Sequence, residues 1–353
     1  MLTLIYTALI CLVSAVPFEH SEHHEHANSE PPVLLVRTLY EYPLGTWIEN
    51  IAVRPTGELL LTLLNVPELH ELDPSEANST PQLVHRFSRA LALSGIAEID
   101  DDTFALSAGN FSFDNGPTSG SWSIWSVAFG NDESIEADVA KITDLPEATF
   151  LNGFCNLPST TKPHSVLAGD IRKGTITRVN TTTGDHSVAI SNNLTAVVPD
   201  PVFGEAGVNG IHVHHGNLYF ANTGQGIFAR IPIHPDGTPA GQPEVIAHVL
   251  NSTQEFDDFA IQGEYAYLVT GSGNSIERIS LGGTPRGRIV AGSLNSTVFA
   301  EPTSAAFGRT EKDKHILYVV TGGGLATPVN GNITVGAQVL AVDTSMWSHT
   351  RGR

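Results

Sequence analysis

In the stretch from Gly207 to Ile233, GVNGIHVHHGNLYFANTGQGIFARIPI, an Asn-Gly pair (Asn209-Gly210) stands just before a run of alternating apolar residues. A Gly turn separates this run from LYFAN, and another separates LYFAN from IFARIPI. Runs rich in β-branched and aromatic residues between Gly and Asn turns are typical of antiparallel strands. The stretch therefore predicts two antiparallel strands joined by a turn, with a third strand to follow.

Comparable units recur along the chain at a spacing of roughly 45 to 57 residues. Each unit has a polar or Asn-Gly entry, an apolar strand, a Gly turn, a strand with aromatic residues and a further strand. There are six, beginning near Ile48, Ser94, Leu151, Val208, Asp257 and Thr303. Such a spacing fits one four-stranded blade per unit. The sequence predicts an all-β fold, a six-bladed β-propeller formed by a single domain.

Residues 34–43, LLVRTLYEYP, precede the first unit and have the pattern of a strand. We expect this segment to supply the outer strand of the last blade. Such a strand ties the two ends of the ring together and covers an edge that would otherwise be exposed. The propeller is thus expected to span residues 34–345, followed by a C-terminal tail at residues 346–353.

The N-terminus carries the pattern of a secreted protein. Residues 1–15 are a short apolar segment ending in Val13-Ser14-Ala15, which suits cleavage as a signal peptide. Residues 16–33 are rich in His and Glu and are expected to be a disordered tail. The chain also has seven N-x-S/T sequons, predicted as glycosylation sites, at Asn78, Asn110, Asn180, Asn193, Asn251, Asn295 and Asn332. Together these features predict a glycoprotein that is secreted or lies in the lumen of the secretory pathway.

The charge balance excludes two classes of partner. The chain has 37 acidic and 18 basic residues and a formal net charge of −19, which opposes binding to phosphate backbones and anionic lipids. No apolar run after the N-terminus approaches the roughly 20 residues of a membrane helix. We therefore expect neither nucleic-acid binding nor a membrane span.

Polar residues at the unit starts are the candidate site. Because blades are arranged radially, equivalent positions in the units become neighbours at the central channel. Those positions hold Glu49, Asn152, Asn209 and Asp257. Their hard oxygen atoms suit a divalent metal such as Ca²⁺, and they equally suit a hydrogen-bonding pocket without metal. The Asn-Gly pairs could also be turn chemistry alone, and these alternatives stay open.

Two further segments carry a family resemblance. VNGIHVHHGNLYFANTGQGIFAR and SVLAGDIRKGTITRV, with Asp170 in the latter, resemble blades of the gluconolactonase and senescence-marker-protein family of six-bladed propellers. The resemblance implies a divalent metal on the channel axis, held by Glu49, Asn152, Asn209 and Asp257. The chain departs from the family pattern at WIENIAV in the first unit, at Asp257-Asp258-Phe259 and after Asn152.

A closer resemblance lies in GTWIENIAVRPTGELLLT, LNGFCNLP and GVNGIHVHHGNLYFANTG. These segments are similar to fungal propellers of natural-product pathways, the hetero-Diels-Alderases of tropolone-sesquiterpenoid biosynthesis. The resemblance implies a pericyclase of terpenoid secondary metabolism. It would dehydrate a hydroxymethyl-tropolone to an o-quinone methide and guide its stereoselective cycloaddition to a humulene-type alkene.

That reaction assigns roles to the candidate residues. Loss of water needs a general acid, for which Glu49 and Asp257 are the candidates, and the developing carbonyl needs donors, for which Asn152 and Asn209 are the candidates. The alkene has almost no polar handle, so an apolar wall must hold it. The residues predicted to contact substrate are Trp47, Phe154, His212, Asp258 and Phe259.

Two other classes of function remain as alternatives. The first is a metal-dependent lactonase or related hydrolase, and the second is a non-catalytic secreted binding propeller, because one fold hosts all of these. The chain has no G-x-S-x-G motif, no P-loop and no dinucleotide-binding motif between a strand and a helix. The usual hydrolase and nucleotide-binding signals are therefore absent from the sequence.

Overall fold

The structure, a computed structural model, describes residues 34–130, 137–158, 164–251, 254–283 and 287–348. The expected signal peptide and the His- and Glu-rich tail lie outside the described residues, as do residues 349–353. The regular secondary structure of the described residues is β-strand except for one short helix, α1 (Ser345–Ser348), near the start of the expected C-terminal tail. No helix in this described part is long and apolar enough to cross a membrane.

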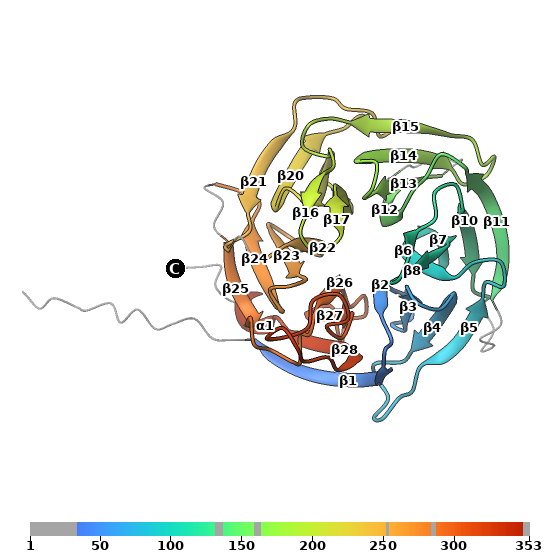
Figure 1. Cartoon of the computed structure of the whole chain (residues 1–353). Helices are drawn as coiled ribbons and strands as arrows, with labels where there is room; N and C mark the ends of the chain where they lie inside the picture. The colour runs from blue at the N-terminus through green and yellow to red at the C-terminus, as the bar shows by residue number, and fades with distance from the viewer. Residues whose placement is uncertain (1–33, 131–136, 159–163, 252–253, 284–286, 349–353) are drawn as a thin grey trace, which may run out of the picture. The chain divides into compact units, whose positions relative to one another are not determined.

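Six four-stranded antiparallel sheets are arranged as blades around a ring (Figure 1). Blade 1 comprises β2 (Ile48–Val53), β3 (Leu59–Leu63), β4 (Glu68–Leu72) and β5 (Gln82–Arg86). Blade 2 comprises β6 (Ala92–Asp100), β7 (Thr103–Gly109), β10 (Trp122–Ala128) and β11 (Asp138–Leu145). Blade 3 comprises β12 (Leu151–Leu157), β13 (Ser165–Asp170), β14 (Thr175–Asn180) and β15 (His186–Ser191).

The second half of the chain completes the ring. Blade 4 comprises β18 (Val208–His214), β19 (Asn217–Asn222), β20 (Ile227–Pro232) and β21 (Glu244–His248). Blade 5 comprises β22 (Phe256–Gln262), β23 (Tyr265–Thr270), β24 (Ser275–Ser280) and β25 (Gly287–Gly292). Blade 6 comprises β26 (Pro302–Phe307), β27 (Ile316–Thr321), β28 (Gly336–Asp343) and β1 (Leu35–Leu44). The prediction of a six-bladed, all-β propeller is confirmed.

The ring closes as the sequence predicted. β1 lies antiparallel to β28, from Leu35 opposite Asp343 to Leu44 opposite Gly336. The N-terminal strand is thus the outer strand of the last blade, and it covers the edge of β28 that would otherwise be exposed.

The core lies between neighbouring blades, and β3 shows why its sequence is LLLTL. In a strand, successive side chains point to opposite faces of the sheet. Leu59 and Leu61 pack in a cluster with blade 6, whereas Leu60 packs with blade 2, and all three are fully buried. A strand covered on both faces needs apolar residues at consecutive positions, so the alternation of a half-exposed strand is lost.

The inner strand of every blade contains an irregularity at the same place. In β12 the register shifts between Leu151 and Phe154, and the inner strands of the other blades shift at the equivalent position. Such a bulge sets extra residues against the partner strand and redirects their side chains. The bulged residues include Glu49, Asn152, Asn209 and Asp257.

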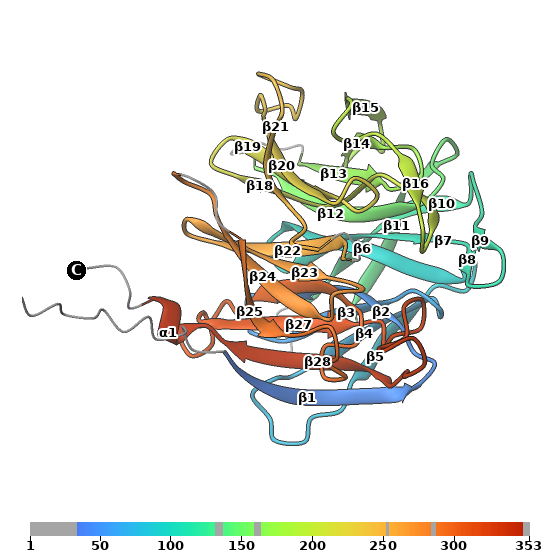
Figure 2. The same cartoon turned by 60° about the vertical axis from the view of Figure 1, so that its left-hand side comes forward.

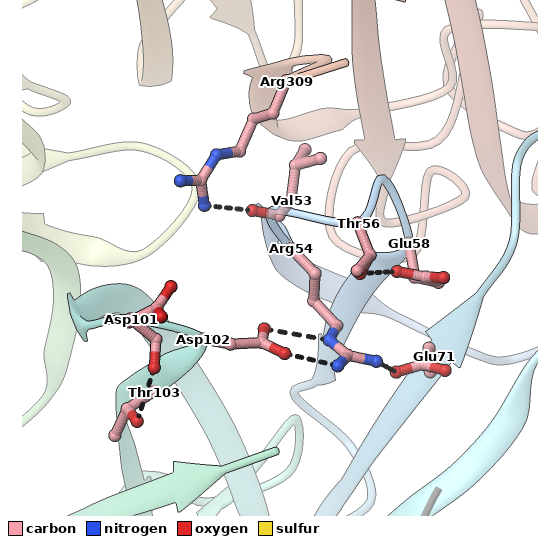
Figure 3. Close-up of polar contacts among 9 residues, drawn as sticks. All are labelled: Val53, Arg54, Thr56, Glu58, Glu71, Asp101, Asp102, Thr103 and Arg309. Carbon is pink, nitrogen blue, oxygen red and sulfur yellow. Dashed lines mark hydrogen bonds and ion pairs between the residues drawn. The ribbon is translucent and has the colours of Figure 1, made fainter. Parts of the chain in front are cut away.

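Two arginines link three blades at the far ends of the inner strands (Figure 3). Arg54, directly after β2, binds both carboxylate oxygens of Asp102 in blade 2 and, through Nη1, Glu71 Oε2 at 2.9 Å. Its guanidinium also lies 3.9 Å from the centre of the Phe129 ring. Arg309 of blade 6 donates to the carbonyl oxygen of Val53 at 3.0 Å. These contacts fix blade 1 between its two neighbours.

We expect Arg54→Leu to lower the free energy of unfolding by about 2 kcal/mol, because it leaves Asp102 and Glu71 half-buried without their cation. Urea denaturation measures the change. Lys314→Gln is the matched control, since Lys314 pairs with Glu311 on the exposed surface and such pairs contribute about 0–1 kcal/mol. Equal midpoints for the Arg54 variant and the unsubstituted protein would contradict a stabilising role.

The sequons differ in exposure. Five of the asparagines are exposed and two are partly buried, the latter being Asn110 and Asn180. Asn180 Oδ1 accepts hydrogen bonds from the backbone N–H groups of Thr182 and Thr183. Glycosylation and the secretory route stay predictions.

Candidate functional site

A cavity of about 260 Å³ lies where the inner strands begin. Its lining includes all four residues that the unit starts predicted, which come from blades 1, 3, 4 and 5: Glu49, Asn152, Asn209 and Asp257. Residues far apart in the sequence therefore meet in one site. The chemical roles of these four residues stay predictions.

Glu49 is buried and hydrogen-bonded at both carboxylate oxygens. Oε1 accepts a hydrogen bond of 2.7 Å from Asn152 Nδ2, and Oε2 accepts one from Trp47 Nε1. Burial nevertheless raises the pKa of Glu49 to about 7, and the neighbouring carboxylates of Asp258 and Glu301 add to the rise. Glu49 therefore changes its protonation state close to neutral pH.

Asp257 shares this environment but has fewer partners. Burial and then the charge of Glu49 raise the pKa of Asp257 well above its usual value, and no described residue donates a hydrogen bond to its carboxyl group. Two carboxyl groups that repel each other's charge titrate as a pair and hold one proton between them. The hydrogen-bond donors on Glu49 oppose the rise of its pKa, whereas Asp257 has no such donor among the described residues. The cavity thus offers an acid and a base together.

Each of the two asparagines uses one of its two amide N–H groups within the protein. Asn152 gives its Nδ2 hydrogen bond to Glu49, and Asn209 gives one of 3.0 Å to Thr223 Oγ1. The Oδ1 atom of Asn209 is buried and has no partner among the described residues. An unsatisfied buried carbonyl oxygen costs about 1–3 kcal/mol, so Asn209 is suited to accept a hydrogen bond from a ligand. The second N–H of Asn209 has no partner among the described residues, so the role of Asn209 as a donor stays a prediction.

The apolar wall also differs from the prediction. Trp47 lines the cavity, but Phe154 and Phe259 do not. Both are almost fully buried between blades, where Phe259 packs edge-on against Phe228 with ring centres 4.9 Å apart. The aromatic side chains that do line the cavity with Trp47 are Phe111, Phe113, Phe150 and Phe203.

Most of these aromatic residues come from two insertions that the repeat pattern did not predict. The hairpin β8 (Phe111–Ser112) with β9 (Gly116–Pro117) interrupts blade 2, and β16 (Val198–Asp200) with β17 (Gly204–Ala206) links blades 3 and 4. Figure 2 shows both on the same side of the ring. A signal was present in the sequence, because the units starting near Ser94 and Leu151 are the two longest.

His212 and Asp258, predicted to contact substrate, contact each other. His212 Nε2 lies 3.0 Å from Asp258 Oδ1, and Ser304 Oγ donates to Asp258 Oδ2 at 2.8 Å. Neither His212 nor Asp258 lines the cavity. At Gly210, one blade back, a Cβ atom would lie 2.2 Å from Asp258 Oδ1, so glycine makes room for this carboxylate. Substrate contact by His212 and Asp258 therefore stays a prediction, and this cavity gives it no support.

Asp170 holds two cavity residues in place. Its carboxylate accepts hydrogen bonds from the backbone N–H groups of Thr149, Phe150, Arg172 and Lys173 at 2.7 to 3.2 Å. Phe150 and Arg172 both line the cavity. Asp170, a residue of the motif SVLAGDIRKGTITRV, thus joins the loop before blade 3 to the β13–β14 turn.

The metal expected from the family resemblance fits this donor set only in part. Two carboxylates and two amides supply hard oxygen atoms, and the unpartnered Asn209 Oδ1 suits a cation. Both oxygens of Glu49 already accept hydrogen bonds, however, and burial favours the protonated state of Glu49 and Asp257. Among the described residues, no group of three or more His, Cys, Asp and Glu side chains is arranged to hold a metal ion. The arrangement fits a proton-sharing pair better than a resident metal.

The fold and the cavity define a six-bladed β-propeller with an acidic, aromatic-walled site on its axis. No family model matches the chain. Solved structures with this fold include regucalcin, a calcium-binding protein from Agrobacterium tumefaciens, with 16% identity, a TM-score of 0.57 and coverage of 88% of this chain and 95% of that one. Another is the PQQ-bound aldose sugar dehydrogenase of Streptomyces coelicolor, with 17% identity, a TM-score of 0.56 and coverage of 89% and 99%. At these identities the likeness shows the fold alone.

Proteins related in sequence give more specific information than the solved structures that share the fold. The chain is 27% identical to a protein of Sarocladium schorii provisionally named a hetero-Diels-Alderase, over 90% of this chain and 86% of that protein. It is also 27% identical to a protein of a Phoma species with the same provisional name, over 83% of this chain and 88% of that protein. The resemblance predicted from the sequence is confirmed.

Proposed function

We propose that the chain is a pericyclase of the hetero-Diels-Alder type. Its substrate is a hydroxymethyl-tropolone, which it dehydrates to an o-quinone methide and adds to a humulene-type alkene. The observation that carries the proposal is that two carboxyl groups with pKa values raised by burial, Glu49 and Asp257, line one aromatic-walled cavity. The similarity to two proteins provisionally named hetero-Diels-Alderases supports it.

The dehydration step uses both carboxyl groups. Asp257 gives its proton to the hydroxyl of the hydroxymethyl group, the carbon–oxygen bond breaks, and water leaves. Glu49 takes the proton of the ring hydroxyl, so a neutral o-quinone methide results. The proton then returns from Glu49 to Asp257, which restores the pair. Acid and base groups positioned in this way contribute about 10²- to 10⁴-fold to a rate.

The cycloaddition step relies on packing. Ligand sites commonly enclose about 300–1,000 Å³, and a cavity of about 260 Å³ is suited to the ring partner alone. The alkene then rests against the rim, where the two hairpins present Phe113 and Phe203. Holding two reactants in register converts a bimolecular step into an effectively unimolecular one.

Reconstitution of the reaction tests the proposal. The purified protein, a hydroxymethyl-tropolone and humulene are expected to give one stereoisomer of the cycloadduct at a rate that EDTA does not change. Product analysis by chiral chromatography measures the outcome. A mixture of stereoisomers formed at the rate without protein would contradict the proposal and leave a non-catalytic binding propeller.

A second candidate is a divalent-metal-dependent hydrolase of lactones. The buried, unpartnered Oδ1 of Asn209 is the observation that favours it. Stoichiometric Ca²⁺ in elemental analysis, with lactone hydrolysis that a chelator abolishes, would establish this activity in place of the pericyclase.

A further inference from the structure

Arg172 is the one basic residue among the described residues that line the cavity. It follows β13, and its backbone N–H donates to Asp170 Oδ1 at 3.0 Å. Its side chain is held at a second point, because Nη1 donates to the carbonyl oxygen of Glu205 on β17 at 2.7 Å. The guanidinium therefore joins the β13–β14 turn to the β16–β17 hairpin at the cavity.

The surroundings of this cation are acidic. Glu49, Glu205 and Asp257 line the same cavity, and the whole chain carries a formal net charge of −19. A ligand with a negative oxygen would be repelled by such a surface unless a local positive charge receives it. A guanidinium has five N–H donors, so one contact with a backbone carbonyl leaves donors for a ligand. Its planar fork suits two oxygen atoms on neighbouring atoms of a ring.

The same turn presents an aromatic face. Phe150 lines the cavity, and its backbone N–H donates to the Asp170 oxygen that also fixes Arg172. Phe203 lines the cavity from the hairpin that Arg172 holds. One carboxylate therefore positions both a cation and a ring, as recognition of a flat anion requires.

We propose that Arg172 determines substrate specificity by binding an anionic oxygen on a planar ring. The substrate class is a planar ring that carries a carbonyl and, on the neighbouring ring atom, a hydroxyl acidic enough to ionise. The identification of that ring as a tropolone rests on the proposed function. In the reaction, Arg172 stabilises the negative charge on the ring oxygen from the transfer of its proton to Glu49 until the loss of water gives the neutral o-quinone methide. Arg172 thereby also orients the ring within the cavity.

Equilibrium binding of three small probes tests this proposal without turnover. Tropolone ionises near neutral pH, 2-methoxytropone has the same ring but no ionisable hydroxyl, and benzoate is a planar anion without a tropolone ring. The unsubstituted protein is expected to bind tropolone at pH 8 at least tenfold more tightly than 2-methoxytropone. Arg172→Gln is expected to weaken tropolone binding about 10- to 100-fold, the usual effect of losing a hydrogen bond to a charged group, and to leave 2-methoxytropone binding unchanged.

Lys173→Gln is the matched control, because it removes the same charge from the next residue of the same turn, and Lys173 does not line the cavity. It is expected to bind all three probes like the unsubstituted protein. Arg172→Lys keeps the positive charge but lacks the planar guanidinium. Its affinity for tropolone is expected to lie between those of the unsubstituted protein and Arg172→Gln. If Arg172→Gln fails to fold, the tropolone affinity of Arg172→Lys decides the test.

The outcomes separate this proposal from the proposed function. Equal tropolone affinity in the unsubstituted protein and the Arg172 variants would overturn the role of Arg172, and so would the absence of any preference for the two anions over 2-methoxytropone. Binding of benzoate that depends on Arg172, without binding of tropolone, would uphold the anion site and overturn the tropolone substrate.

Discussion

Glu49→Gln is expected to lower turnover by about 10²- to 10⁴-fold, the usual contribution of a positioned acid or base. Glutamine keeps the size of Glu49 but cannot take the proton of the ring hydroxyl. The melting temperature should move by no more than about 2 °C, because two effects oppose each other. The amide satisfies only one of the two donors, Trp47 and Asn152, while the substitution removes a carboxyl group whose burial raises its pKa.

Glu277→Gln is the matched control for this experiment. Glu277 is also a buried glutamate, and burial raises its pKa to about 7, but it lies on β24 and does not line the cavity. Its variant should retain full turnover. Asp257→Asn should lose turnover to a degree similar to Glu49→Gln. A large fall in melting temperature with Glu49→Gln would instead assign Glu49 a structural role.

The architecture could be predicted from the sequence because its signals are local and repeated. Each unit carries its own strands and turns, and the spacing of units identifies the blade. The closure of the ring by residues 34–43 was predictable for a related reason. An extra strand pattern before the first unit has no other place in a closed ring, and β1 indeed pairs with β28.

Their equivalent positions in the repeated units also predicted that Glu49, Asn152, Asn209 and Asp257 lie in one cavity. The same reasoning was wrong about the neighbouring phenylalanines. Phe154 is two residues after Asn152, and Phe259 is two after Asp257, so a regular strand would place each pair on one face. The bulge in each inner strand interrupts this alternation, and the phenylalanines turn into the core. A bulge depends on pairing with the neighbouring strand, which a single sequence does not specify.

The remaining parts of the site lie outside the repeat. Phe111 and Phe203 belong to hairpins that occur once each, so no periodicity marks them. Asn209 donates one of its two N–H groups to the hydroxyl of Thr223, fourteen residues away, and its Oδ1 has no partner among the described residues. This pairing joins β18 to the turn after β19, so it forms only once blade 4 has folded.

The acidic interior predicts an unusual dependence of stability on pH. Burial raises the pKa of Glu49, Glu277 and Glu301 to about 7 and that of Glu255 to about 8. In an unfolded chain these groups titrate near pH 4.5, so the folded protein holds more protons between pH 4.5 and 8. Stabilisation from these groups is therefore fully present below about pH 4.5 and is lost as the pH rises through 7 to 8.

We expect the free energy of unfolding to be at least about 3 kcal/mol lower at pH 8.5 than at pH 5. A tenfold change in a group's acid dissociation constant on folding corresponds to about 1.4 kcal/mol. Glu301 interacts with Glu49 and with Glu255, so the contributions of these three groups do not simply add. Urea denaturation across this range measures the slope.

Glu277 isolates one contribution to this slope, because both of its carboxyl oxygens are buried without a partner among the described residues. Glu277→Gln should raise stability by about 2 kcal/mol at pH 8.5 and leave it almost unchanged at pH 5. A variant that shifts stability equally at both pH values would show that packing around Glu277, and not its ionisation, causes the difference.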